Sequence, residues 1–158
     1  MTELASPTPT LTPHIVCRGA AEAIDFYKSA FGAEELMRMP GQDGKLMHAA
    51  VTIDGAMLML VDENTDWGLL SPLSLGGSPV TLHLNVANAD AAIDKAVAAG
   101  ATIAMAAHDA FWGDRYGVVK DPFGHSWSLA HPLRAAMSED ELRAAAQDAT
   151  CGQPGPAA

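Results

Sequence analysis

The feature that most constrains the fold is an internal repeat. The segment HIVCRGAAEAID, which begins at His14, aligns without a gap with HLNVANADAAID, which begins at His83. Both segments start with histidine and end with Ala-Ile-Asp, and the same offset places Gly55 on Gly124. A repeat of this length in a chain of 158 residues indicates two copies of one supersecondary unit.

Each copy shows the same succession of patterns. A short strand is followed by a helix with apolar residues on one face, and Asn88 and Gly100 supply a cap and a stop for the second helix. Three further strands follow in each copy, joined by turn sequences such as Asp-Pro-Phe-Gly. The expected strands are residues 11–17, 34–40, 45–53 and 56–62 in the first copy, and 80–86, 102–108, 115–120 and 125–131 in the second.

These patterns predict an α+β fold made of two βαβββ modules. The modules occupy residues 11–132, as 11–63 and 79–132. A flexible segment, 1–10, precedes them, and residues 133–158 are expected to form a helix that starts with a capping box at Ser138, followed by a disordered tail. Each helix should cover one face of its sheet. The other faces of the two curved mixed sheets should then enclose a cavity.

The side chains expected to line this cavity combine histidine, thioether and small polar groups. A few polar groups in an apolar cavity orient a bound molecule, and methionine adapts to irregular shapes. The segment HDAFWGDRYG adds aromatic rings that could stack on a flat or cationic ligand. A structural alternative is that Trp112 packs on its own hairpin while Arg115 pairs with Asp114 or Asp121. The candidate ligand-binding residues are His14, Met57, Met59, His83, Asn85, Trp112, Arg115, Tyr116 and Ser128.

Charge and composition exclude several classes of partner. The formal net charge of −10 argues against nucleic acid and against an anionic membrane surface. No apolar run approaches the roughly 20 residues of a membrane-spanning helix, and the N-terminus has no signal-peptide pattern. The two cysteines, Cys17 and Cys151, are not expected to pair. We therefore expect a cytoplasmic protein.

Two stretches carry a resemblance to a known family. AAEAIDFYKSAFGAEE, from Ala20, and FWGDRYGVVKDPFGHSWSLAH, from Phe111, resemble the PhnB-like subgroup of the vicinal oxygen chelate superfamily, which includes glyoxalases, bleomycin-resistance proteins and extradiol dioxygenases. The resemblance implies the glyoxalase/bleomycin-resistance fold and a homodimer. In metal-dependent members it also implies a divalent ion such as Zn, Ni, Mn or Fe.

The ligand set that the resemblance implies is incomplete in this chain. The first-strand ligands carry over to His14 and His83, with Thr12 and Thr81 as the alternative register. The last-strand carboxylate falls on Ser128, and its counterpart in the first module falls on Met59.

A catalytic divalent site usually needs three protein ligands, and two histidines alone hold an ion weakly. Strand alternation directs Asp62 and His131 to the opposite face. We therefore predict no metal and no other cofactor, with both cavity histidines hydrogen-bonded. No function is predicted for His48 or for His125, which is expected near solvent.

Two functions from different classes follow. The favoured one is binding of a small, partly aromatic molecule in the cavity between the modules, without a catalytic metal. The alternative is a divalent-metal-dependent lyase, isomerase or dioxygenase, which would use His14 and His83 as ligands. The sequence leaves open whether the protein is an enzyme, which ligand it takes, and whether the modules pair within one chain or between two.

Overall fold

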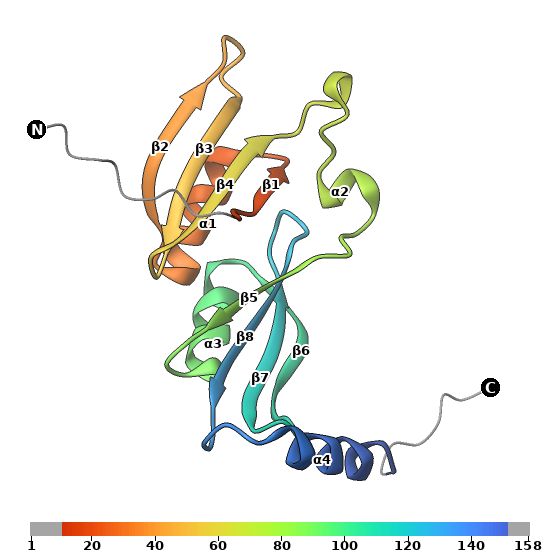
Figure 1. The fold of residues 1–158 in the computed structure, drawn as a ribbon. Helices are drawn as coiled ribbons and strands as arrows, with labels where there is room; N and C mark the ends of the chain where they lie inside the picture. The colour runs from red at the N-terminus through yellow and green to blue at the C-terminus, as the bar shows by residue number, and fades with distance from the viewer. Residues whose placement is uncertain (1–10, 152–158) are drawn as a thin grey trace, which may run out of the picture.

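The two predicted βαβββ modules are present in a computed structural model, which describes residues 11–151 (Figure 1). The expectations for residues 1–10 and for the tail beyond residue 151 lie outside this range. The first module contains β1 (His14–Cys17), α1 (Ala20–Phe31), β2 (Glu34–Pro40), β3 (Leu46–Ile53) and β4 (Ala56–Asp62). The second contains β5 (Thr81–Asn85), α3 (Ala89–Ala99), β6 (Thr102–Asp109), β7 (Asp114–Lys120) and β8 (Ser126–Pro132).

Short helical segments connect and follow the modules. The linker carries a 3₁₀ turn (Thr65–Trp67) and the one-turn helix α2 (Pro72–Leu75). Helix α4 (Glu139–Cys151) follows β8. Its predicted capping box is formed, because Ser138 and Glu141 each accept a hydrogen bond from the other's backbone N–H. Over residues 11–151, no helix is both long and apolar enough to span a membrane.

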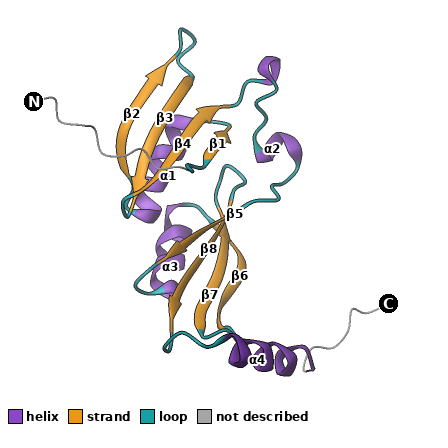
Figure 2. Ribbon diagram, viewed as in Figure 1, coloured by secondary structure: helices purple, strands orange, loops and turns teal. Residues whose placement is uncertain are grey.

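Each module builds a mixed four-stranded sheet with the same topology. The strand orders are β1-β4-β3-β2 and β5-β8-β7-β6, in which β1–β4 and β5–β8 are the parallel pairs (Figure 2). The registers also match, since His14 lies opposite Met59 and His83 lies opposite Ser128. The duplication seen in the sequence is therefore a duplication of sheet geometry.

Helix α1 starts without a capping side chain of its own. Gly19, at the N-cap, adopts a left-handed conformation with φ of 96°. The carboxylate of Asp62, at the end of β4, accepts hydrogen bonds from the backbone N–H groups of Gly19 and Ala20, at 3.0 and 2.9 Å. A negative charge is favourable at a helix N-terminus, so Asp62 ties the helix to the sheet it covers.

The two modules share one core. We expected each helix to cover its own sheet, and α1 also packs against the second module. The ring of Trp127, on β8, lies 5.2 Å from Tyr27 and 4.7 Å from Phe31, both on α1 (centroid to centroid). Helices α1 and α3 pack against one another, and buried residues of both, including Tyr27 and Ile93, belong to one continuous apolar cluster. Burial of this shared surface holds the modules together.

The sheets do not close on one another. They lie one after the other along the molecule, joined by the linker, while α1 and α3 cover one face of each (Figure 2). The faces turned away from the helices are called the open faces below. Within one chain the open faces do not enclose the expected cavity, because the helices place the sheets end to end.

Candidate functional site on the open sheet faces

Strand alternation and register define which side chains reach the open faces. On the first sheet they include His14 opposite Met59, which in turn lies opposite Ala50 of β3. On the second sheet, His83 lies opposite Ser128, which lies opposite Val118 of β7. Two residues before Ala50 and Val118 stand His48 and Tyr116. The predicted residues on the open faces are His14, Met57, Met59, His83, Asn85, Tyr116 and Ser128.

His83 is held by two hydrogen bonds. Its Nδ1 lies 2.8 Å from the hydroxyl of Ser128, and its Nε2 lies 3.3 Å from Oδ1 of Asn85. An amide oxygen only accepts, so Nε2 donates, and Nδ1 of the neutral ring accepts the Ser128 hydroxyl proton. Ser128 is buried beneath the ring. The residue that replaces the expected carboxylate therefore orients an imidazole.

Tyr116 is the centre of an aromatic cluster on the same face. Its ring is nearly parallel to that of His83, with an interplanar angle of 16° and centroids 6.4 Å apart. His108 and Trp112 meet Tyr116 edge-on at 6.1 and 5.3 Å, and Phe111 meets Trp112 at 5.0 Å. The indole N–H of Trp112 donates to Asp114. The open face of the second sheet thus offers aromatic surfaces beside oriented polar groups.

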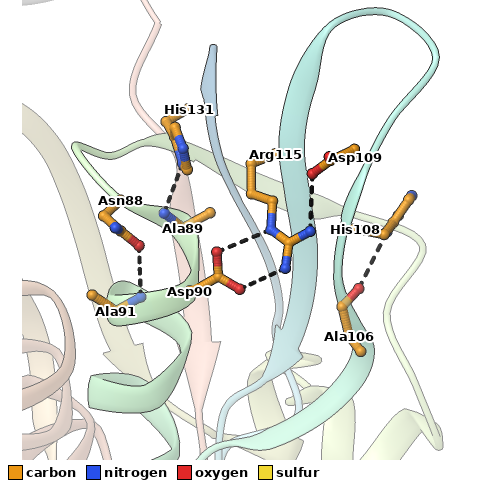
Figure 3. A network of polar contacts seen from close by, with 9 residues as sticks. All are labelled: Asn88, Ala89, Asp90, Ala91, Ala106, His108, Asp109, Arg115 and His131. Carbon is orange, nitrogen blue, oxygen red and sulfur yellow. Dashed lines mark hydrogen bonds and ion pairs between the residues drawn. The ribbon is translucent and has the colours of Figure 1, made fainter. Parts of the chain in front are cut away.

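Arg115 lies on the opposite side of β7 from this cluster. Its guanidinium binds both carboxylate oxygens of Asp90, on α3, at 2.8 and 2.9 Å, and a carboxylate oxygen of Asp109 at 2.9 Å (Figure 3). These contacts raise the pKa of Arg115. The prediction that Arg115 pairs with Asp114 or Asp121 is therefore wrong. The structure gives Arg115 a role in joining α3 to the edge of the second sheet.

His14 differs from its repeat partner His83. The ring of His14 meets the ring of His48 edge-on, with centroids 5.6 Å apart, across the intervening strand β4. Within residues 11–151, neither imidazole has a hydrogen-bond partner, so the expected satisfied histidine is wrong for His14. Partial burial and the neighbouring His48 imidazole lower the pKa of His14. One signal in the sequence could have identified His48. It stands two residues before Ala50, which lies opposite Met59, so strand alternation places His48 on the same face as Met59.

Two cavities are lined by residues of both modules. One of about 600 Å³, between the end of α1, the β3–β4 turn and the end of β5, includes Asn85 in its lining. Another of about 350 Å³, between β1 and the linker, includes His14. These two predicted residues therefore belong to different cavities rather than to one.

Other polar groups named by the sequence have structural contacts. Asp62 and His131 point to the helix side, as alternation predicted, and His131 accepts a hydrogen bond from the backbone N–H of Ala89. His125 was expected near solvent and is buried, with Nε2 donating to the carbonyl of Val16 at 2.9 Å. Burial raises the pKa of the neighbouring Cys17 thiol. His125 therefore links the second module to β1 of the first.

The described residues contain no ready-made site of imidazole and carboxylate ligands. Within residues 11–151, no group of three or more His, Cys, Asp or Glu side chains is placed to hold a metal ion. On the second sheet, Ser128 and Asn85 engage both nitrogens of His83. The divalent ion that the resemblance implies for some members does not fit this set of groups, because a carboxylate is missing and the imidazole is already bonded.

Comparison with known proteins agrees with this architecture. A protein of Mycobacterium tuberculosis is 53% identical over 140 residues, covering 87% of this chain and 82% of its own length. An X-ray structure of an Arabidopsis thaliana gene product has a TM-score of 0.62 and 28% identity, covering 80% of this chain and 99% of its own. The structure of a PhnB protein from Bacillus cereus shares the fold, with a TM-score of 0.61, 21% identity, and coverage of 78% and 99%.

A family model matches most of the chain. The model that matches residues 10–129 describes the glyoxalase/bleomycin resistance protein/dioxygenase superfamily. The match covers the whole first module and the second module as far as Leu129 in β8. The chain belongs to this superfamily.

Proposed function

We propose that the protein binds a small, partly aromatic molecule on the open face of its second sheet, without a catalytic metal. The observation that carries this proposal is the fixed His83–Tyr116 pair. The two rings are nearly parallel, and hydrogen bonds from Ser128 and Asn85 set the orientation of the imidazole. Rings held in advance lose less conformational freedom on binding, so a flat ligand gains stacking without paying to order them.

The surroundings favour a neutral or cationic ligand. Asp114 lies beside Trp112, and the whole chain carries a formal net charge of −10. Aromatic faces attract cations, and an acidic protein repels anions. A planar cation is therefore the ligand class that fits this face best.

We further propose that the working form is a cytoplasmic homodimer. Within residues 11–151 the open faces carry exposed apolar side chains, with Met39 50% and Met105 47% accessible. A second copy that placed its own open face opposite would enclose the aromatic cluster and bury these side chains. Sedimentation analysis of the purified protein tests this state directly.

The binding proposal is tested by titration with a planar cationic dye, proflavine. We expect proflavine to quench tryptophan fluorescence, and we expect Tyr116→Ala to weaken binding about tenfold, since base–aromatic stacking contributes about 1–3 kcal/mol. Trp67→Phe is the matched control, because Trp67 is exposed on the linker and should leave the dissociation constant unchanged. Quenching that disappears with Trp67→Phe and persists with Tyr116→Ala would refute the site.

The competing function is a divalent-metal enzyme. Metal content is measured on untagged protein purified without chelator, and then after adding Zn(II) or Ni(II). A stoichiometric divalent ion that is lost in the His83→Ala variant would replace the binding proposal with the enzyme. We expect no such ion, since Ser128 stands where a carboxylate would be needed.

A further inference from the structure

The first sheet repeats the His83–Tyr116–Ser128 arrangement with different chemistry. His14 occupies the place of His83, and Met59 the place of Ser128, because each histidine lies opposite that residue in the parallel pair. His48 occupies the place of Tyr116, two residues before the residue opposite Met59. In the first module the ring of His48, on β3, reaches across β4 to the ring of His14 on β1. In the second module the ring of Tyr116, on β7, reaches across β8 to the ring of His83 on β5. The duplicated scaffold thus presents two equivalent clusters.

The side chains of the first cluster are all potential metal ligands. The two imidazoles meet edge-on across β4 with centroids 5.6 Å apart, and Met59, on β4, lies opposite His14. Within residues 11–151 neither imidazole is engaged in a hydrogen bond, whereas both nitrogens of His83 in the equivalent cluster are. The imidazole nitrogens of the first cluster are therefore available to a ligand.

The donor set selects the kind of ion. Thioether sulphur is a soft ligand that suits Cu(I), and imidazole also binds copper, whereas ions that prefer oxygen need carboxylates. Over the described range, no carboxylate joins these histidines in a metal-binding group. Further thioethers are close at hand on the same open face, since Met37 lies opposite Ala50 and Met39 lies opposite His48.

We propose that His14, His48 and Met59 form a Cu(I) site on the open face of the first sheet. The site is separate from the aromatic cluster of the second sheet, so the proposal does not depend on the proposed function. The ion binds as Cu(I), and no electron transfer is required. Met37 and Met39, on β2, supply further thioethers at the border of the site.

The test is anaerobic titration of the full chain with Cu(I), kept reduced by ascorbate, in competition with a chromogenic Cu(I) chelator. A Cys151→Ser background is used, because a free thiol itself binds Cu(I). We expect one Cu(I) per chain. Loss of a single first-sheet ligand, in Met59→Leu or His48→Gln, should weaken binding by at least about tenfold.

A matched variant comes from the same sheet. Met47→Leu removes a thioether from β3 on the side of the strand opposite to His48, and it should leave Cu(I) affinity unchanged. Ag(I), which has no redox chemistry here, should shift the ¹³C-methyl NMR signal of Met59 and not that of Met105. Equal affinity of wild type and Met59→Leu, tighter binding of Zn(II) than of Cu(I), or absence of Cu(I) binding in the Cys151→Ser background would each overturn the proposal.

Discussion

The hydroxyl of Tyr27 donates a 2.7 Å hydrogen bond to the buried carboxylate of Asp121, and this bond joins the two modules. Tyr27 lies on α1 of the first module, and Asp121 begins the Asp-Pro-Phe-Gly turn of the second. The same carboxylate accepts from the indole N–H of Trp127 and from the backbone N–H groups of Phe123 and His125. Burial and the adjacent Asp121 carboxylate raise the pKa of Tyr27, which therefore remains a donor.

Replacing Tyr27 with phenylalanine should destabilise the protein through this bond. The carboxylate of Asp121 would lose one of its four donors while it stays buried, and a hydrogen bond to a charged group contributes about 1.5–3 kcal/mol. Urea unfolding should show a decrease of that size in the free energy of unfolding. Tyr116→Phe is the control, because among the residues that the structure describes none hydrogen-bonds to that hydroxyl, and it should change stability by less than about 0.5 kcal/mol. Equal effects of the two variants would contradict the role of Asp121.

Gly117 on β7 should not tolerate alanine. A Cβ atom there would lie 2.5 Å from Cδ1 of Ile93, on α3, and 3.2 Å from the backbone of Ala107. We expect Gly117→Ala to reduce the free energy of unfolding by about 1–3 kcal/mol, as overpacking of a close contact does. Because Ile93→Val removes the nearest atom, the double variant should lose less stability than the sum of the two single variants. Simple additivity would mean that α3 does not approach the sheet this closely.

The ion pair between Lys28 on α1 and Glu35 on β2 should weaken only well below pH 4.5. Hydrogen bonds from Arg38 and then from Lys28 lower the pKa of Glu35 from 4.5 to about 2. Since the folded pKa lies below the unfolded one, the stabilising effect is complete above pH 4.5. It is lost as the pH falls toward 2. Carboxyl ¹³C NMR should give a midpoint near 2 for Glu35.

The Arg38→Gln variant checks the cause of this shift. It removes the largest contribution, so the midpoint of Glu35 should move upward toward the ordinary value. An unchanged midpoint would show that Lys28 alone lowers the pKa. The fold itself should persist, because both arginine and glutamate are on the surface.

Ser128→Ala should release the ring of His83. In the wild type, ¹⁵N NMR should show His83 protonated at Nε2 and unprotonated at Nδ1, because Asn85 Oδ1 only accepts. Without the serine hydroxyl, we expect a mixture of tautomers and a loss of about 0.5–1.5 kcal/mol in stability. Ser126→Ala, one step along the same open face, is the control and should leave the tautomer unchanged. A single tautomer in both variants would show that Asn85 is sufficient.

The local structure was predictable from the sequence because its signals are local. The repeat, the helix cap at Asn88 and the turn glycines depend on residues a few positions apart, and the observed strand bounds follow them closely. The period of two along a strand also assigned Asp62 and His131 correctly to the helix side. The duplicated βαβββ modules and the family were predicted on this basis and are confirmed.

The contacts between distant segments were decided by the tertiary structure. The ring pair His14–His48 spans two strand pairings, so it depends on the registers of three strands at once. The placement of α1 against the second module buries Trp127, and His125 is buried where it meets β1 of the first module. The same packing leaves the sheets end to end with open faces. Sequence periodicity states which face a side chain takes. The surface that this face meets is decided by how much apolar area each packing of the two modules removes from water.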